Sequence, residues 1–278
     1  MLAPSFVVFA VFVFFPLVYT FYLSGTTWNL VSPHKTLIGL GNYQKLLRTR
    51  LFWQVLSNTT VFSVAVVCVC LALGLGLALL LNRRMAGRGV YRAVIFSPYV
   101  ATPAAIAMVW LWIFNPQYGL VNEVLRIIGV RGPDWLLSTQ WALPALIIMT
   151  IWRFAGYDMV IFLGGLQNIP VELREAARMD GATAWVEFWR ITFPLLSPTT
   201  FFIVTTTAIS MFQVFDTVAV MTAGGPVDAT NVVVYYLYEH AFRFFEAGYA
   251  SAVAVVLFAI VLTLTAIQFR LSGRWVHY

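Results

Sequence analysis

The chain has 278 residues, of which 61% are hydrophobic and only 10% are charged. A soluble domain usually has about 25% charged residues, so this composition excludes an ordinary water-soluble protein and indicates that lipid is the main solvent. The formal net charge is +6, but the sequence contains no polybasic tail of the kind that binds nucleic acid, and no nucleic-acid partner is expected.

Six runs of mostly apolar residues are each long enough to cross a membrane. As a helix, about 20 such residues span a hydrocarbon core of roughly 30 Å. The sequence therefore predicts an all-α integral membrane protein, in which residues 1–278 form one transmembrane domain surrounded by membrane lipid. The predicted spans are residues 2–24, 56–81, 94–114, 141–166, 197–221 and 248–269.

Basic residues predict the orientation, because short cytoplasmic loops are enriched in Lys and Arg. The densest basic cluster lies between the second and third runs, at Arg83, Arg84, Arg88 and Arg92. With six spans, a cytoplasmic location for this link places both termini in the cytoplasm as well. The first connection fits this orientation poorly, because it would face outward and yet contains four basic residues and no acid: Lys35, Lys45, Arg48 and Arg50.

Two outer connections, residues 126–135 and 222–246, contain Gly, Pro and mixed charge. This composition is typical of solvated loops. They are expected to contact an external partner or to serve as plain linkers.

Within the second run, small residues recur at Gly74, Gly76 and Ala78. Small residues at four-residue spacing allow two membrane helices to pack closely, and packing is the role expected here.

The connection between the fourth and fifth runs, residues 168–194, contains a short helix with signals at both ends. Pro170 suits the first helical position, and Glu172 favours the positive end of the helix dipole. Gly181 suits the left-handed residue that ends a helix. Periodicity alone fits two roles equally well, docking onto another protein and lying flat on the bilayer.

Residue identity favours docking. The order Glu175, Ala176, Ala177, Gly181, Ile191 and Pro194 reproduces the EAA signature, with the Gly four residues after the second Ala and the Ile ten further on. The chain thereby resembles the permease subunits of bacterial binding-protein-dependent ABC importers, although Phe193 stands where that family usually has Leu.

The resemblance implies a type I importer permease of six transmembrane helices with a cytoplasmic coupling helix. In such permeases this helix sits in a groove on the ATPase subunit. Glu175 would make the polar contact, Ala176 and Ala177 would allow close packing, and Gly181 would supply the turn into the next helix. The residues implied in coupling are Glu172, Glu175, Ala176, Ala177, Asp180 and Gly181.

The sequence contains no GxxxxGK[ST] phosphate-binding loop. This chain is therefore expected to be no enzyme and to hold no cofactor, with ATP and Mg²⁺ used by partner subunits. The resemblance implies two ATPase subunits, an extracytoplasmic solute-binding protein and a second permease subunit. The permease pair is either a homodimer or, as in the resembled subfamily and favoured here, a heterodimer with a similar but distinct subunit. The resemblance also implies the bacterial cytoplasmic (inner) membrane as the location.

Further segments resemble the carbohydrate importers of the maltose-permease class. They are Asn42 and Tyr43, residues 211–226 and residues 242–252. That class includes glycerol-3-phosphate and glycerophosphodiester permeases, which residues 224–234 and the ending 275–278 resemble. The resemblance leaves a sugar and a phosphorylated glycerol compound open as substrate.

Charges within spans cost about 2.5 to 3.5 kcal/mol each, so Arg153, Asp158 and Asp216 are functional candidates. Arg153 and Tyr157 share one helical face, whereas Asp158 lies about 140° from Arg153 around the helix. Arg153 either faces the translocation path and accepts a polar or phosphorylated solute, or forms a structural ion pair with Asp216 or Asp158. The resemblance places five residues at the substrate site: Thr150, Phe154, Tyr157, Phe212 and Gln213.

Two other classes of function were weighed. An intramembrane enzyme would need a motif such as HExxH or GxSxG, and the sequence has neither. An ATP-independent channel or scaffold protein fits the composition but leaves the EAA segment unexplained.

Overall fold

The computed structural model describes residues 3–83 and 85–275, and nearly all of its regular structure is helical. Leu2, Arg84 and residues 276–278, on which the sequence analysis drew, lie outside the described residues. The first half contains α1 (Ala3–Phe9), a π-helical turn (Ala10–Phe14), α2 (Phe15–Ser24), β1 (Thr26–Thr27), β2 (Thr36–Leu37), α3 (Gly41–Arg48), α4 (Arg50–Leu81), α5 (Arg88–Val100), α6 (Pro103–Ile113) and α7 (Leu120–Ile127). The second half contains α8 (Ala142–Gln167), α9 (Val171–Met179), α10 (Ala184–Glu187), a π-helical turn (Phe188–Thr192), α11 (Phe193–Leu195), α12 (Ser197–Phe212), α13 (Asp216–Met221), α14 (Val233–Tyr238), a third π-helical turn (Glu239–Arg243) and α15 (Ala247–Trp275).

Within the described ranges, four helical stretches are long and apolar enough to cross a membrane. They are Pro4–Ser24, Arg50–Leu81, Ala142–Gln167 and Ala247–Gly273. Two bent helix pairs raise the number of candidate spans to as many as six.

The third predicted run, residues 94–114, is not one straight helix. It is divided between α5 and α6, which meet at an angle of 98°. Pro103 begins α6, and Thr102 before it is extended at ψ 138°. A residue that precedes proline is driven out of the helical region by its ring, which explains the break.

The fifth predicted run, residues 197–221, is also interrupted. Helix α12 ends at Phe212, and α13 begins only at Asp216. The Asp216 carboxylate lies in the first turn of α13, where the helix dipole favours negative charge. The charge of Asp216, which would be costly inside a continuous span, thus lies at the start of a helix.

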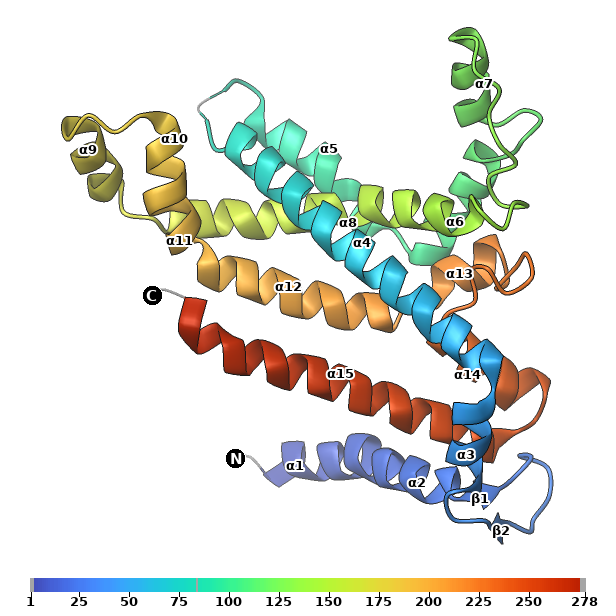
Figure 1. The fold of residues 1–278 in the computed structure, drawn as a ribbon. Coiled ribbons are helices and arrows are strands. Elements are labelled where there is room, and N and C mark those ends of the chain that lie inside the picture. The colour runs from blue at the N-terminus through green and yellow to red at the C-terminus, as the bar shows by residue number, and fades with distance from the viewer. Residues whose placement is uncertain (1–2, 84, 276–278) are drawn as a thin grey trace.

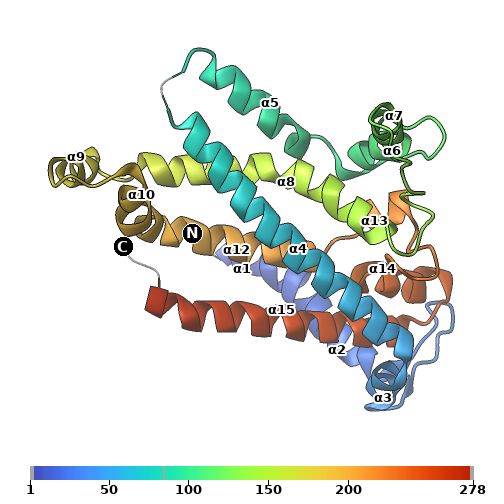
Figure 2. The same ribbon diagram turned by 45° about the horizontal axis from the view of Figure 1, so that its top comes forward.

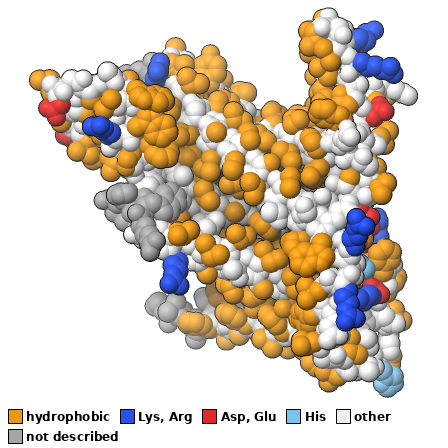
Figure 3. Space-filling view, viewed as in Figure 1, with side chains coloured by type: hydrophobic (Ala, Val, Ile, Leu, Met, Phe, Trp, Pro, Cys, Tyr) orange, Lys and Arg blue, Asp and Glu red, His pale blue; other side chains and the backbone are white. Residues whose placement is uncertain are grey.

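The long helices lie lengthwise between two ends of the molecule. In Figures 1 and 2, α4 crosses α8, α12 and α15 obliquely, and α1–α2 runs beside α15. One end contains α9, α10, the link between α4 and α5 and the two ends of the chain. The opposite end contains the β1–β2 hairpin, α3, α7, α13 and α14. Charged side chains gather at these two ends, and the surface between them is mainly hydrophobic (Figure 3).

The contact between α4 and α8 depends on small residues. Gly74 and Ala78 are buried, and a β-carbon on Gly74 would lie 2.7 Å from the Cβ atom of Asp158. Gly76, on another face of α4, has no atom within 4 Å of such a β-carbon. Of the three small residues in this run, Gly74 and Ala78 therefore form the packing surface.

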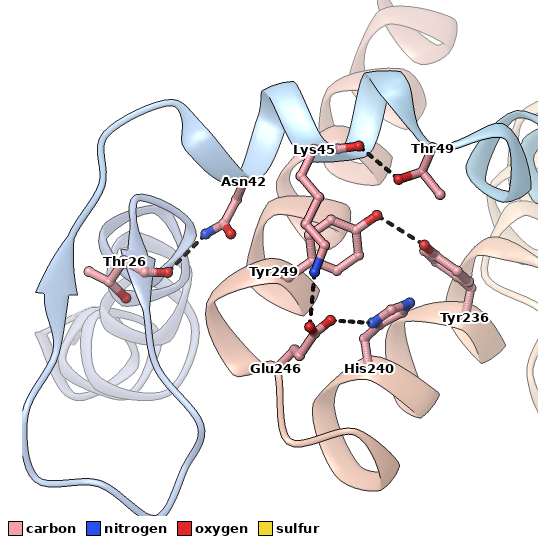
Figure 4. Close-up of polar contacts among 8 residues, drawn as sticks. All are labelled: Thr26, Asn42, Lys45, Thr49, Tyr236, His240, Glu246 and Tyr249. Atoms are coloured by element: carbon pink, nitrogen blue, oxygen red, sulfur yellow. Dashed lines mark hydrogen bonds and ion pairs between the residues drawn. The ribbon is translucent and has the colours of Figure 1, made fainter.

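A polar network at the end opposite α9 accounts for one of the basic residues in the first connection (Figure 4). Lys45 Nζ lies 2.9 Å from Glu246 Oε1 and 4.6 Å from the centre of the Tyr249 ring. His240 Nδ1 lies 2.8 Å from the other Glu246 oxygen, and the Tyr236 and Tyr249 hydroxyls are 2.9 Å apart. The network joins α3 to the segment that leads into α15, so Lys45 is compensated by a carboxylate 201 residues away.

The protonation of this network follows from its surroundings. Burial lowers the pKa of His240, although its contact with Glu246 opposes the shift. Burial acts to raise the pKa of Glu246, but hydrogen bonds from Lys45 and His240 outweigh it and bring the pKa below the ordinary value. At neutral pH the network therefore contains a neutral imidazole and an ionised carboxylate.

The expectation of a solvated loop over residues 222–246 was wrong for much of the segment. Thr230, Asn231, Val232, Val233 and Tyr235 are almost completely buried. The apolar sequence from Val233 to Tyr238 forms α14 and packs against α15 and α4. Burial of that apolar surface outweighs the loop-forming tendency of the neighbouring Gly and Pro residues.

Candidate functional site

Helix α9 ends as its sequence predicts. Gly181 has φ +80°, and the Ala182 amide donates a hydrogen bond to the Ala177 carbonyl at 2.9 Å. This bond closes the helix around a left-handed glycine and turns the chain toward α10. Thr183 then accepts a hydrogen bond from the Val186 amide and caps α10.

Helix α9 presents a mixed surface to the outside. Glu172, Glu175, Ala176 and Asp180 are exposed, whereas Ala177 is buried. Three apolar side chains are also exposed on this short helix: Val171, Leu173 and Met179. Acidic and apolar groups together on an exposed helix at one end of the molecule are suited to contact with another protein.

An ion pair joins α9 to α10. The Arg174 Nε atom donates a hydrogen bond to Glu187 Oε1 at 2.7 Å, and the Glu187 side chain is only 8% exposed. A carboxylate in that environment needs such a partner. The ion pair therefore fixes the angle at which α9 meets the helices that follow.

A second group of candidates lies midway along α8. Arg153 lies over two aromatic rings, with its Cζ atom 5.6 Å from the centre of Tyr99 and 5.3 Å from that of Phe154. Tyr99 stacks on Tyr157 at 4.4 Å. The Arg153 Nε–H is buried and has no hydrogen-bond acceptor within the described part of the chain. Thr150, one turn earlier, uses its hydroxyl to bond the Leu146 carbonyl at 2.8 Å.

No direct ion pair holds Arg153. Asp216 is near enough to act on it electrostatically, but no carboxylate among residues 3–83 and 85–275 lies within the 4.0 Å limit of an ion pair with it. The guanidinium is thus held chiefly by aromatic faces, an arrangement that attracts a cation without neutralising it.

Asp158 lies elsewhere. Its side chain is 0% exposed and packs against Gly74 of α4. The Thr207 hydroxyl of α12 is close by, yet neither carboxylate oxygen has a hydrogen bond of good geometry to a described residue. The structure thus separates Asp158 from Arg153 and places it between helices.

Of the candidates after the fourth span, Asp216 lies near Arg153, whereas Phe212 belongs to another part of the core. Phe212 is buried in a different cluster, with Leu46, Tyr236 and Tyr249. Gln213 and Asp216 are exposed where α12 gives way to α13.

Two residues of these groups, Tyr99 and Glu187, were not predicted from the sequence. Tyr99 contributes a ring to the Arg153 cluster from α5, next to the bend of the third run. The only signal for it was an aromatic residue directly after Pro98 within a span. Glu187 could have been noticed as the acid within a segment rich in aromatic residues, 185–193.

Comparisons with known proteins agree with this arrangement. The model of the family described as "Binding-protein-dependent transport system inner membrane component" matches residues 70–277. The chain belongs to this family.

Known permeases align with nearly the whole length of this chain. It is 36% identical over 279 residues to the sn-glycerol-3-phosphate transport system permease protein of Agrobacterium fabrum (strain C58), an alignment that covers 100% of this chain and 95% of that protein. It is 36% identical over 273 residues to YurN, a probable ABC transporter permease protein of Bacillus subtilis (strain 168), with 97% and 93% covered.

A solved structure shows the same fold. A chain of a bacterial alginate ABC transporter, crystallised with an alginate pentasaccharide-bound periplasmic protein, superposes with a TM-score of 0.86 at 22% identity, covering 99% of this chain and 93% of that one. The permease therefore has the type I importer fold. It is the membrane-spanning subunit of a binding-protein-dependent ABC importer, and it works with a binding protein and an ATPase.

Proposed function

We propose that this permease imports an anionic solute, of which sn-glycerol-3-phosphate and glycerophosphodiesters are the leading candidates. The observation that carries the proposal is Arg153, a cation midway along a membrane helix that is held by aromatic rings, with no carboxylate of a described residue within ion-pair distance. A half-buried guanidinium whose Nε–H has no acceptor in the described part of the chain favours a phosphate group. The relative from Agrobacterium fabrum, named for sn-glycerol-3-phosphate transport, gives independent support.

The aromatic and polar groups around Arg153 would contact the rest of the solute. Phe154, Tyr157 and Thr150 share α8 with it, and Tyr99 faces it from α5. Stacked aromatic faces and a hydroxyl suit a polyol backbone. The same groups suit a neutral sugar, which is the second candidate because the maltose-type resemblance extends over most of the chain.

Coupling would take place at α9. Glu172, Glu175, Ala176 and Asp180 lie on its exposed surface, and Ala177 and Gly181 shape its junction with α10. In this proposal α9 docks into an ATPase subunit, and the Arg174–Glu187 pair transmits the motion to α12. This chain holds no cofactor and is no enzyme, and ATP and Mg²⁺ belong to the two ATPase subunits.

The complete assembly would contain a second, distinct permease subunit and an extracytoplasmic solute-binding protein in the bacterial inner membrane. The basic link after α4, α9 and both chain ends lie at one end of the molecule. That end is assigned to the cytoplasm, because the link carries the densest cluster of arginines.

The test is ATP hydrolysis by the assembled complex in liposomes, with the loaded binding protein outside. We expect stimulation by sn-glycerol-3-phosphate or glycerophosphocholine and little by trehalose or maltooligosaccharides. Arg153→Gln should reduce the stimulated rate at least ten-fold, since about 1.4 kcal/mol corresponds to a factor of ten and a hydrogen bond to a charged group contributes about 1.5 to 3 kcal/mol. Stimulation by neutral sugars alone, or full transport by the variant, would refute the anion proposal.

A further inference from the structure

A cavity of about 540 Å³ lies beside α9, at the end of the molecule that also contains the chain termini. Its walls come from the end of α4, the end of α8, α9 and α10. The polar residues that line it are Asn82, Arg83, Arg174, Trp185, Glu187 and Thr192, and apolar side chains such as Leu79 and Leu166 complete it. Neither the EAA signature nor the Arg153 cluster explains this cavity.

The cavity is rich in hydrogen-bond donors. Within the described ranges, the side chains of Asn82, Arg83 and Trp185 make no hydrogen bond. Arg174 uses its Nε atom for Glu187, and its two terminal nitrogens bond no described residue. Among the described lining residues, the charged side chains are Arg83, Arg174 and Glu187, so the positive charges outnumber the negative one.

An excess of donors and positive charge selects an anion. Arg side chains bind phosphate in preference to other groups, because their planar forks match its oxygens. A cavity of this volume is larger than inorganic phosphate needs and falls within the range that binds small organic molecules. A phosphate that is part of a larger molecule fits both properties.

The surroundings indicate a lipid as the source of that phosphate. Trp185 and Trp189 are exposed beside the cavity, and their rings meet edge to face at 5.6 Å. Exposed tryptophans gather where a membrane protein crosses the headgroup layer. Basic pockets between helices on the cytoplasmic side are typical binding sites for anionic headgroups.

We propose that this cavity binds the phosphate group of an anionic phospholipid, with Arg83 and Arg174 as its cationic contacts. Arg174 is also bonded to Glu187, so a bound headgroup would hold α9 and α10 in their relative positions. The consequence for ATP hydrolysis rests on the proposed role of α9 in coupling, whereas the binding site rests only on the proposed cytoplasmic orientation of this end.

The binding site is tested by native mass spectrometry of the purified assembled complex, after exchange into equal amounts of phosphatidylglycerol and phosphatidylcholine. The informative variant is Arg83→Gln, because Arg174 has a structural partner, whereas the side chain of Arg83 bonds no described residue. Arg88→Gln is the matched control, since Arg88 carries the same charge at the start of α5, five residues after Arg83, and is not among the residues that line the cavity. We expect Arg83→Gln to reduce retained phosphatidylglycerol about ten-fold and Arg88→Gln to leave it unchanged.

Added inorganic phosphate identifies the source of the ligand. If phosphate at millimolar concentration leaves the retained lipid unchanged, the lipid headgroup is the ligand. If phosphate displaces the lipid and binds in its place, the lipid proposal is overturned in favour of a soluble phosphate site. Equal retention in both variants, or no preference for phosphatidylglycerol in the unmodified complex, would also overturn it.

A second measurement separates the lipid from a carboxylate of the ATPase subunit. ATP hydrolysis by the unmodified complex is compared with that of Arg83→Gln in liposomes with and without phosphatidylglycerol. We expect the variant to lose activity only where the anionic lipid is present. An equal loss in pure phosphatidylcholine would mean that Arg83 contacts the ATPase, and the proposal would fail while the assignment of α9 would stand.

Discussion

Replacement of Gly74 by alanine tests the packing of α4 on α8. The added β-carbon would lie 2.7 Å from Cβ of Asp158 and 3.1 Å from its backbone carbon. Carbon atoms in good contact are about 3.5 to 4.0 Å apart, so the two helices must separate by roughly 1 Å. Overpacking of this kind costs about 1 to 3 kcal/mol.

The assay is the apparent melting temperature of the purified assembled complex in detergent, followed by the loss of its size-exclusion peak. A chain of this size loses roughly 2 to 4 °C per kcal/mol, so Gly74→Ala should melt about 2 to 12 °C below the unmodified complex. Gly76→Ala is the matched control, because its β-carbon meets nothing within 4 Å and alanine favours the helix. Equal melting temperatures for the two variants would refute the close contact of α4 and α8.

Three further substitutions test other parts of the permease. Gly181→Leu places a side chain on a residue whose φ is +80°. We expect the complex still to assemble, but the loaded binding protein to stimulate ATP hydrolysis at most one tenth as much as in the unmodified complex. Normal transport would contradict this. Gly248→Ala places a β-carbon 1.9 Å from the Thr26 carbonyl oxygen, and should lower the melting temperature by several degrees unless the hairpin moves freely away. His240 has a lowered pKa in the folded protein, so below pH 6.5 the same histidine takes up a proton more readily in the unfolded chain. The free energy of unfolding should therefore fall between pH 7.5 and 5.5, and it should fall less in His240→Gln. Parallel pH profiles of the two proteins would exclude His240 as the cause. Further acidification, below the ordinary glutamate pKa, should remove the stability that ionised Glu246 contributes through its own lowered pKa.

The sequence by itself determined the class of protein and its coupling segment. Long apolar runs must be helices in lipid, because no water is present there to bond an open backbone. The end of α9 was equally predictable, since the left-handed turn at Gly181 depends on that residue and its immediate neighbours. The EAA signature needed only residue identity and spacing.

Contacts between distant segments were decided by the tertiary structure alone. The sequence predicted one uninterrupted span over residues 94–114, and only the structure shows the 98° angle between α5 and α6 that brings Tyr99 to Arg153. Lys45 and Glu246 are 201 residues apart, so no local pattern pairs them.

Two charged residues on the same helix show most clearly what the sequence could not predict. Arg153 and Asp158 differ little in sequence context, yet one faces aromatic rings and the other is enclosed beside Gly74. Helical periodicity gives the angle between two such side chains, but only the packing of α4, α5 and α12 around α8 determines what each side chain meets.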